Sequence, residues 1–545
     1  MQPALDPDFY YLDNFHKALA WLGERHHDLL LAEELAFLQR FGELARPAQA
    51  LLVRLIMRKG RHFRASKLAY AEIGCPLEAA APLLELGWVR ADAELALAEL
   101  FALLRKEELL EQFAAHAHKT LKKPELLERL AAQHATPRSF ADWCPGLDER
   151  VLSLCIEALC ERLRLMFFGN LRQDWSEFVL ADLGIFRYEQ VELSAESRAF
   201  RRRADVDCYL QLQRCRERFE AGAPIAEVLL QLNGLDCATP FLAARQARLL
   251  FRLGQQLERD GELDHALAFY ADCRFAGARL RRIRVLERLA RPAEAHALAC
   301  QAAEAPESEA EVQGVQRALP RLRRQLGLAP AAKAQAPAVA RLDLQLPRPV
   351  DQSVEQAVQA HLSEPEAPVH YVENGLICSL FGLLCWEAIF APLPGAFFHP
   401  FHSGPADLLS EDFHPRRAAL FAARLALLDS DAYREAIRRT YADKYGIQSP
   451  FVFWGVLDEQ LLEQALACLP AAHLRAWFER LLLDIKANRA GMPDLIQFWP
   501  VDKRYRMIEV KGPGDRLQDN QRRWLAFCAE HGMPVDVCYV QWADA

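Results

Sequence analysis

The sequence predicts a multidomain, mostly α-helical protein that ends in a smaller α/β domain. The chain has 545 residues, too many for one hydrophobic core, so we expect three or four domains. Apolar residues recur at helical spacing through most of its length. Near the end, short apolar runs of strand type surround one amphipathic helix.

The composition limits the classes of protein to which the chain can belong. The net charge of −8 argues against nonspecific binding of the whole protein surface to a polyanion. A local basic groove remains compatible with this net charge. The 14 cysteines include no CxxC pair, which is typical of reduced, buried thiols rather than of a disulfide framework or a zinc site. No basic segment followed by an apolar one begins the chain, so we expect no signal peptide and a cytoplasmic protein.

Residues 1–75 are predicted to form an N-terminal helical region. In the stretch 49–74, QALLVRLIMRKGRHFRASKLAYAEIG, one helix is expected to end near Gly60 and a second to begin near Ala65. The link between them is basic, a pattern that is common where helices lie on a phosphate backbone. A solvated basic surface is the equal alternative.

Residues 76–204 are predicted to form the next domain. The segment 101–132 indicates two short helices, with a break in HAHKTLKK and with Pro124 at the start of the second helix. This arrangement resembles a SAP-type helix–extended–helix module, which is a small DNA-binding unit.

Residues 205–348 indicate paired antiparallel helices followed by a linker. Turns at Asp260-Gly261 and Arg291-Pro292 separate the members of two pairs, which resembles a tetratricopeptide-like solenoid. The helix in 273–291 carries seven arginines and one acid, Glu287. Either a phosphate-binding surface or a solvated helix face explains it. The Ala- and Pro-rich segment 327–349 is expected to be a linker.

Residues 349–545 are predicted to form the α/β domain. Its apolar run 376–393 contains Ser379 and Glu387 and ends in prolines, so we expect a buried core helix rather than a membrane span. The stretch 491–515, GMPDLIQFWPVDKRYRMIEVKGPGD, indicates strand, turn and strand. An amphipathic helix that stops at Gly532 and a last strand, VDVCYVQW, follow.

Charged side chains interrupt these strands. Alternation places Glu509 and Lys511 on one face of their strand, and Asp494 stands at the head of the neighbouring one. Two carboxylates that converge at strand ends are best neutralised by a hard divalent cation such as Mg²⁺ or Mn²⁺. A structural ion pair at a strand edge is the alternative.

The same residues carry a family resemblance. PDLIQFW…RMIEVKGPGDRLQDNQRRWL resembles the VRR-NUC group of PD-(D/E)XK nucleases, in the Pro-Asp, Glu-Val-Lys-Gly-Pro, Asp-Arg-Leu and Gln-x-x-Trp-Leu segments. LIMRKGRHFRASKLAYAEI, the segment 166–189 and the segment 395–413, GAFFHPFHSGPADLLSEDF, resemble signatures of the Fanconi-associated nuclease family. The likeness spans nearly the whole chain. A ubiquitin-binding zinc finger, which longer eukaryotic members carry, is absent, so the chain resembles the bacterial form.

The resemblance implies roles for single residues. Asp494, Glu509 and the carbonyl of Val510 would bind the metal, and Lys511 would orient or deprotonate the attacking water and stabilise the developing negative charge. Gln521 would assist from the helix behind the site.

A third acidic metal ligand is implied by the family, from a helix ahead of the nuclease core. It falls on Glu373, in Val-Glu-Asn where the family often has Gly-Glu-Gly, with Glu387 as the rival.

The implied activity is phosphodiester hydrolysis by a structure-specific DNA endonuclease. It would cut branched DNA that carries a 5′ flap, degrade DNA from the 5′ end, and act in repair of interstrand crosslinks without a small-molecule cofactor besides the metal. Arg279 and Arg282 are the candidates for a 5′-phosphate pocket, and Arg516 for a backbone contact. A junction resolvase and a non-catalytic scaffold are the alternatives. The additional DNA-binding domains favour a monomer.

Overall fold

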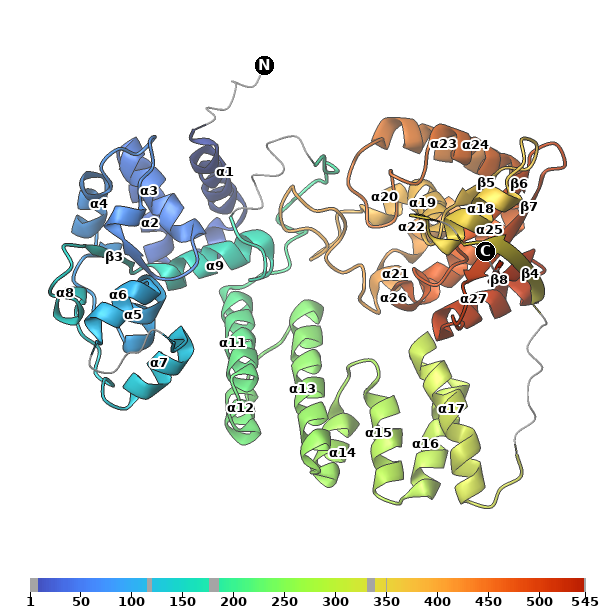
Figure 1. The fold of residues 1–545 in the computed structure, drawn as a ribbon, viewed down its shortest axis with the longest axis horizontal. Helices are drawn as coiled ribbons and strands as arrows, with labels where there is room; N and C mark the ends of the chain where they lie inside the picture. Colours follow the sequence, from blue (N-terminus) through green and yellow to red (C-terminus); the bar gives the residue numbers. More distant parts are fainter. Residues whose placement is uncertain (1–7, 115–119, 176–185, 331–338, 349, 544–545) are drawn as a thin grey trace. The chain divides into compact units, whose positions relative to one another are not determined.

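The computed structural model describes residues 8–114, 120–175, 186–330, 339–348 and 350–543. The chain forms two compact units, Met1–Phe186 with Phe200–Val206, and Arg187–Ala199 with Asp207–Ala545. Helices dominate both units, as predicted (Figure 1). Within the described residues, no helix is long and apolar enough to cross a membrane.

The first unit is helical with one small sheet. Its three strands, β1 (His62–Arg64), β2 (Val89–Arg90) and β3 (Val151–Leu154), are antiparallel in the order β1-β3-β2. The helices are α1 (Tyr10–Arg25), η1 (His27–Leu29), α2 (Ala32–Glu43), α3 (Arg46–Met57), η2 (Ala65–Lys67), α4 (Pro76–Glu85), α5 (Leu97–Leu103), α6 (Lys106–Gln112), α7 (Lys123–Ala131), α8 (Phe140–Trp143) and α9 (Glu157–Phe168).

One helix boundary in this unit was predicted wrongly. After α3 ends at Met57, the chain forms strand β1 and a short 3-10 turn, and no long helix begins near Ala65. Phe63 is buried and pairs with Leu152 of β3, so a tertiary strand contact overrides the local helical pattern. The expected helix pair in 101–132 is present, and Pro124 lies in the first turn of α7. Residues 115–119 and 176–185, which belong to two of the quoted motifs, lie outside the described residues.

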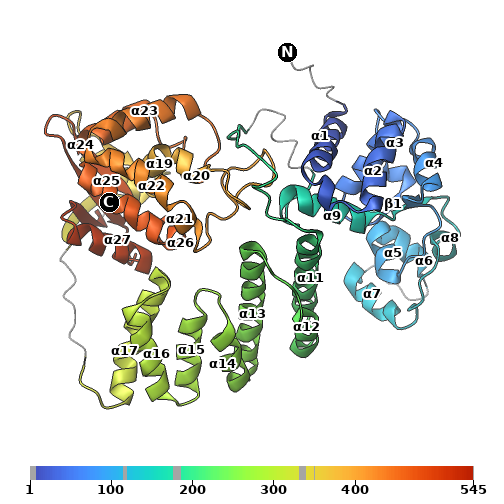
Figure 2. The same ribbon diagram turned by 180° about the vertical axis from the view of Figure 1, so that it is seen from behind.

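Antiparallel helices follow from residue 203 onward. They are α11 (Arg203–Glu220), α12 (Ile225–Leu232), α13 (Pro240–Asp260), α14 (Leu263–Asp272), α15 (Ala278–Arg288), α16 (Pro292–Glu304) and α17 (Glu309–Gln325). The turns stand where the sequence predicts them. Gly261 ends α13 with a left-handed φ of +87°, and Pro292 begins α16. Figure 2 shows from behind that α15, α16 and α17 lie side by side.

A five-stranded sheet, in the order β4-β8-β7-β6-β5, forms the centre of the C-terminal part. Its strands are β4 (Ala340–Pro347), β5 (Val369–Tyr371), β6 (Leu495–Trp499), β7 (Arg504–Lys511) and β8 (Val535–Ala543). β4 pairs with β8 and β8 with β7 in parallel, whereas β5, β6 and β7 are antiparallel. The predicted order of strand, strand, helix and strand is therefore confirmed.

The linker prediction for 327–349 is wrong for its second half. Residues 340–347 form the edge strand β4. Leu342, Leu344 and Leu346 alternate along it and pack against the core of the sheet. This period of two was present in the sequence beside the prolines that suggested a linker.

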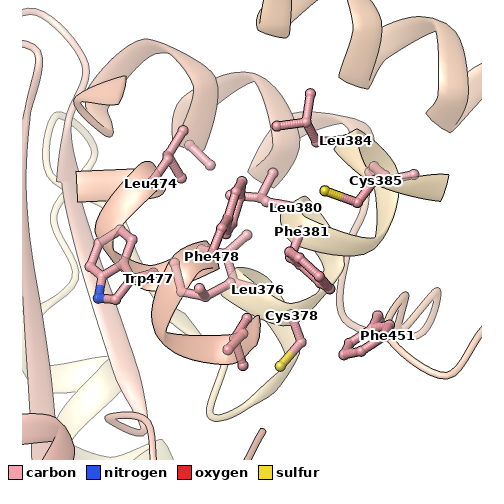
Figure 3. Packing of buried hydrophobic residues seen from close by; sticks show 14 of the residues in the cluster. Leu376, Cys378, Leu380, Phe381, Leu384, Cys385, Phe451, Leu474, Trp477 and Phe478 are labelled. Atoms are coloured by element: carbon pink, nitrogen blue, oxygen red, sulfur yellow. The ribbon is translucent and has the colours of Figure 1, made fainter. Parts of the chain in front are cut away.

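Helices cover both faces of the sheet. The helices of this part of the chain are α18 (Val354–Leu362), α19 (Gly375–Leu384), α20 (Trp386–Ile389), α21 (Phe413–Arg416), α22 (Ala418–Leu425), η3 (Ala426–Asp429), α23 (Ala432–Lys444), α24 (Glu459–Cys468), α25 (Ala471–Leu483), α26 (Ile485–Asn488) and α27 (Asp519–Glu530). α18 packs on the face that carries Ile508 and Val510. Every residue of α19 is buried, which confirms the predicted core helix. Phe381 of α19 packs against Phe478 of α25 and Phe451 (Figure 3).

Candidate active site

The antiparallel pairing of β6 and β7 brings the predicted acidic residues together. Leu495 pairs with Ile508, so the next position outward places Asp494 beside Glu509. Gly491 lets the chain enter β6 close to the start of α27. It has a φ of +94°, and a Cβ atom there would meet Asn520 at 2.8 Å. The register and this close approach therefore fix where Asp494 begins its strand.

Neighbouring groups compensate little of the negative charge on the Glu509 carboxylate. Its side chain is 0% exposed, and the Nζ atom of Lys511 lies 2.6 Å from its Oε1 atom. This contact is an ion pair rather than a well-directed hydrogen bond, and Oε2 has no hydrogen-bond partner among the described residues. Burial, followed by the charge of Asp494, raises the pKa of Glu509 to about 7 against the opposing effect of Lys511. An unsatisfied buried carboxylate is costly, so this position invites a cation.

Asp494 is held through its side chain and its backbone. Its Oδ2 atom accepts the N–H of Val510 at 2.8 Å. Its carbonyl accepts the N–H groups of Val372 and Glu373, both at 2.9 Å. Burial raises the pKa of Asp494 to about 6, opposed by the Val510 bond and Lys511 and supported by Glu355 and Glu373. The half-buried Asp494 and the buried Glu509 thus share one negatively charged site.

Glu373 lies directly between β5 and α19. The Tyr371 hydroxyl donates to its Oε2 atom at 2.8 Å, and the Asn374 Nδ2 atom donates to its Oε1 atom at 3.0 Å. Its φ of +35° is left-handed, which is uncommon for a non-glycine residue and is typical of functional sites. The Asn374 Oδ1 atom accepts the N–H of Met492, so Asn374 joins Glu373 to the segment that leads into Asp494.

Glu387, the rival of Glu373, belongs to a different environment. Its side chain is 72% exposed and pairs with Arg424 at 3.2 Å. Glu373, by contrast, is among the charges that raise the pKa of both Asp494 and Glu509. The arrangement favours Glu373.

Three residues near the site were not predicted. Tyr371 and Asn374 hold Glu373, and Glu355 in the first turn of α18 adds negative charge near Asp494. The only signal in the sequence was Asn374 itself, which stands where the family often has glycine. Glu355 and Tyr371 are distant in sequence from Asp494, so spacing alone could not indicate them.

The donor set fits a hard divalent cation. Within the described ranges, no three His, Cys, Asp or Glu side chains are already gathered as a metal cluster. Asp494, which is half-buried, and Glu509, which is buried, nonetheless offer two carboxylates whose ionised forms are disfavoured by burial; the charge of Asp494 adds to this at Glu509. A cation bound between them would relieve both penalties, and oxygen ligands of this kind suit Mg²⁺ or Mn²⁺.

The two other predicted residues of this region lie around α27. The Gln521 Oε1 atom accepts the N–H of Gln518 at 2.8 Å in a capping box, so Gln521 stabilises the start of the helix. Arg516 is exposed in the turn between β7 and α27.

The two arginines predicted for phosphate binding lie on α15 in different surroundings. Arg279 donates from Nε and Nη2 to Glu311, at 2.8 and 2.5 Å, and also to the carbonyl of Ala305. Glu311 is 1% exposed, so Arg279 neutralises a buried acid. The buried Nε atom of Arg282 has no hydrogen-bond partner within the described part of the chain. Of the two arginines, Arg282 therefore has fewer hydrogen-bond partners within the described part of the chain.

Comparison with known proteins gives three family-model matches: a VRR-NUC domain at residues 429–542, a FAN1 HTH domain at 9–90, and a Fanconi anemia-associated nuclease SAP domain at 94–143. The chain is 61% identical to the Fanconi-associated nuclease 1 homolog of Pseudomonas aeruginosa, over 99% of this chain and 97% of that protein. It is 26% identical to the Arabidopsis thaliana homolog, over 98% of this chain and 67% of that protein. A crystal structure of paFAN1 bound to 5′-flap DNA with a gap and a 2-nucleotide flap matches with a TM-score of 0.92 and 60% identity, covering all of both chains.

Proposed function

The chain belongs to the Fanconi-associated nuclease family, and on that premise we propose that it is a metal-dependent endonuclease for branched DNA with a 5′ flap. The observation that carries the proposal is the cluster of the half-buried Asp494 with the buried Glu509 and Lys511, which the pairing of β6 and β7 brings together. A relative that is 60% identical has been solved with 5′-flap DNA. We further propose 5′-to-3′ exonuclease activity and a role in interstrand crosslink repair, as the family resemblance implies.

Asp494, Glu509, the carbonyl of Val510 and Glu373 are the groups that would hold the metal, proposed as Mg²⁺ or Mn²⁺. When bound, such an ion polarises the scissile phosphate and lowers the pKa of a water molecule.

Lys511 acts beside these carboxylates. The residue is 7% exposed, so its ammonium group is poorly hydrated and would interact strongly with a substrate phosphate. It orients the attacking water and stabilises the negative charge that develops on the phosphate oxygens. Gln521 supports this geometry from α27 through its cap on the helix start.

DNA binding is distributed over the rest of the chain. The HTH and SAP domains are proposed to hold duplex arms through phosphate contacts, which position DNA without reading its sequence. Arg516 is proposed as a backbone contact and Arg282, with Arg279, as the receptor of a 5′ phosphate. Arg279 would then serve two partners, because Glu311 already binds it. We propose that the protein acts as a monomer on nucleoid DNA in the cytoplasm.

The domain limits are proposed as 1–75, 76–204, 205–348 and 349–545, in the order N-terminal helical, SAP-like, tetratricopeptide-like with linker, and nuclease. Limited proteolysis with mass spectrometry tests them, because cleavage should concentrate near these limits.

Cleavage assays with labelled 5′-flap, 3′-flap and four-way junction substrates test the proposed activity. We expect cutting of the 5′ flap that requires Mg²⁺ or Mn²⁺ and stops with EDTA. Asp494→Ala and Glu509→Ala should lower the rate by several orders of magnitude while flap binding survives, because binding depends on basic residues elsewhere. Preferred cutting of symmetric four-way junctions would favour a resolvase. Binding without cutting on all substrates would favour a scaffold.

A further inference from the structure

Two aromatic side chains are exposed at the edge of a fixed aromatic cluster. The cluster consists of Tyr441 in α23, Tyr445 just beyond the end of α23, and Trp454. Their ring centroids lie 5.2 to 5.7 Å apart, and the Nε1 atom of Trp454 donates to the Ile447 carbonyl at 2.7 Å. Tyr445 is 55% exposed, and Phe453, next to Trp454 in the chain, is 41% exposed. Apolar rings that folding leaves in water are candidates for binding a ligand.

The backbone on both sides of Phe453 is fixed against the N-terminal part of α19. The Oγ atom of Ser379, in α19, accepts the N–H of Phe453 at 2.9 Å. The Phe453 carbonyl accepts the N–H groups of Val456 and Leu457 at 2.9 and 3.0 Å, which closes a turn. Val456 packs against Gly375, the first residue of α19, where a Cβ atom would lie 3.1 Å from it. Phe453 therefore presents its ring from a rigid turn.

This turn lies next to the proposed metal ligand Glu373. Gly375, which Val456 contacts, stands two positions after Glu373 in the chain. An α-helix rises 1.5 Å per residue, so Ser379 lies about 6 Å along α19 from Gly375. Successive nucleotides of one duplex strand are about 3.4 Å apart along the axis. A DNA strand that is held at Glu373 therefore reaches Phe453 within a few nucleotides.

A cation stands beside the exposed rings. The Nη1 atom of the exposed Arg187 donates to the Tyr445 carbonyl at 3.2 Å, and the Arg187 carbonyl accepts the N–H of Gln448 at 2.7 Å. The Tyr445 carbonyl is neutral, so this bond does not cancel the positive charge of Arg187. Aromatic rings with a nearby guanidinium group suit single-stranded nucleic acid, because every base has a π-face and every linkage has a negative phosphate. The position beside the metal-binding carboxylates favours a nucleobase over a protein side chain as the occupant.

We propose that Tyr445 and Phe453 form a stacking platform for unpaired bases of the DNA that enters the metal site, with Arg187 at the phosphates of the same strand. The inference deepens the proposed DNA-cutting function, on which it rests. Bases inside a duplex have both faces covered by their neighbours, whereas an unpaired base can turn one face toward an aromatic ring. The unpaired bases belong either to the flap or to a gap in the opposite strand, and both present the same π-face.

The test compares three double variants of the full-length protein. Tyr445→Ala with Phe453→Ala removes both rings. Tyr445→Phe with Phe453→Tyr keeps both rings and serves as the rescue variant. Leu420→Ala with Leu483→Ala is the matched control, because it removes two apolar side chains of α22 and α25 that are 43% and 76% exposed.

Affinity for fluorescein-labelled 5′-flap DNA is measured by anisotropy in EDTA, which prevents metal-dependent cutting. The alanine variant should bind a flap with unpaired nucleotides about tenfold more weakly than wild type, the effect of one lost base–aromatic contact. Its affinity for a nicked duplex without unpaired bases should stay within about twofold of wild type, as should the rescue and control variants on both substrates. Unchanged flap binding by the alanine variant overturns the inference. Equal losses in the rescue or control variant, or on the nicked duplex, overturn it as well.

A fluorescent base then locates the contact. Single 2-aminopurines, whose fluorescence falls when they stack on a ring, are placed at each unpaired position of the flap and of a gap in the opposite strand. Wild type and the rescue variant should quench a position that the alanine variant leaves bright, and its place tells the flap from the opposite strand. An abasic linker at that position should remove the difference in affinity between wild type and alanine variant, and a difference that survives overturns the inference.

Two outcomes with wild type complete the test. If wild type quenches no unpaired position, the inference is overturned whether or not the alanine variant folds. Wild type that neither binds nor cuts flap DNA defeats the proposed function itself. Normal cutting by wild type together with an unaffected alanine variant defeats this inference alone.

Discussion

Replacing the central acid of the sheet should stabilise the metal-free protein. The charges nearest to the Glu509 carboxylate are those of Asp494 and Lys511, and Glu373 adds further negative charge, so Glu509→Gln leaves Lys511 to balance Asp494. The pKa of Glu509 is raised to about 7 from an ordinary 4.5. Each pKa unit between folded and unfolded states is worth about 1.4 kcal/mol, so ionised Glu509 lowers the free energy of unfolding by roughly 3 kcal/mol.

The sign of this effect depends on pH in a defined window. Below pH 4.5 the Glu509 carboxyl is protonated in both states and contributes no penalty. As pH rises from about 4.5 to 7, the unfolded chain releases its proton first, so the unfolded state gains stability and the folded state loses it. Above pH 7 the penalty is complete. The advantage of Glu509→Gln should therefore be near zero at pH 4.5 and greatest at pH 8.

Native-state hydrogen exchange measures this change in the free energy of unfolding at the two strands. It is followed by mass spectrometry on peptides that cover β6 and β7. In EDTA at pH 8, the variant should exchange these amides roughly 100-fold more slowly than wild type, which corresponds to about 3 kcal/mol. Added Mn²⁺ should protect wild type and leave the variant nearly unchanged, because only wild type has both carboxylates. The control is Glu530→Gln, which removes an exposed acid from α27.

Equal exchange in wild type and variant at pH 8 would refute the reasoning, because it would mean that Glu509 is not an uncompensated charge. A variant advantage of the same size at pH 4.5 would refute it equally, because it would trace the effect to packing.

Three further predictions concern single side chains. Glu373→Gln should abolish cutting of 5′-flap DNA. Glu387→Gln should keep the cutting rate within about twofold of wild type, since Glu387 is exposed and paired with Arg424. A metal-bound structure with Glu373 far from the ion would contradict the assignment of Glu373. Lys511→Met should lower the single-turnover rate at least about 100-fold with little change in flap affinity, and an unchanged rate would remove Lys511 from the mechanism. Arg282→Ala should reduce the preference for a 5′-phosphorylated flap about tenfold without lowering the unfolding temperature. Arg279→Ala should reduce this preference too, and it should also lower the free energy of unfolding by about 3–5 kcal/mol, because the buried Glu311 loses its partner.

The sequence indicated the parts of the fold that depend on local pattern. The β6 and β7 strands, the stop of α27 before Gly532 and the helix turns at 260–261 and 291–292 follow from periodicity and turn chemistry. Strand β1 was missed because only pairing with distant β3 makes it a strand. The edge strand β4 was missed because its alternating leucines lie between proline-rich segments.

The same distinction holds at the site. Asp494, Glu509 and Lys511 could be predicted because one hairpin joins them, and two residues along a strand share a face. Glu355 could not, because it belongs to α18, a segment that only the tertiary fold brings near Asp494. In the arginine-rich helix the sequence indicated excess charge but not which arginines are free, because that depends on the acids of neighbouring helices.

The buried acids of the protein differ in how far neighbouring cations balance their charge. Among the described residues, five Asp or Glu residues are buried: Glu34, Asp205, Glu258, Glu311 and Glu509. Three of them are structural, because arginines meet them in close, hydrogen-bonded pairs, as Arg203 meets Glu34 at 2.7 Å. Such pairing removes the cost of burial and leaves no charge for a ligand.

Glu258 and Glu509 depart from that balance in opposite directions. Glu258 faces three arginines, so positive charge is left over around it. Glu509 shares a single lysine with Asp494, so negative charge is left over where a cation could bind. Folding alone would favour neutral pairs at both positions, since each unbalanced charge lowers the free energy of unfolding. The divalent cation proposed for this site would balance the negative charge left over at Glu509.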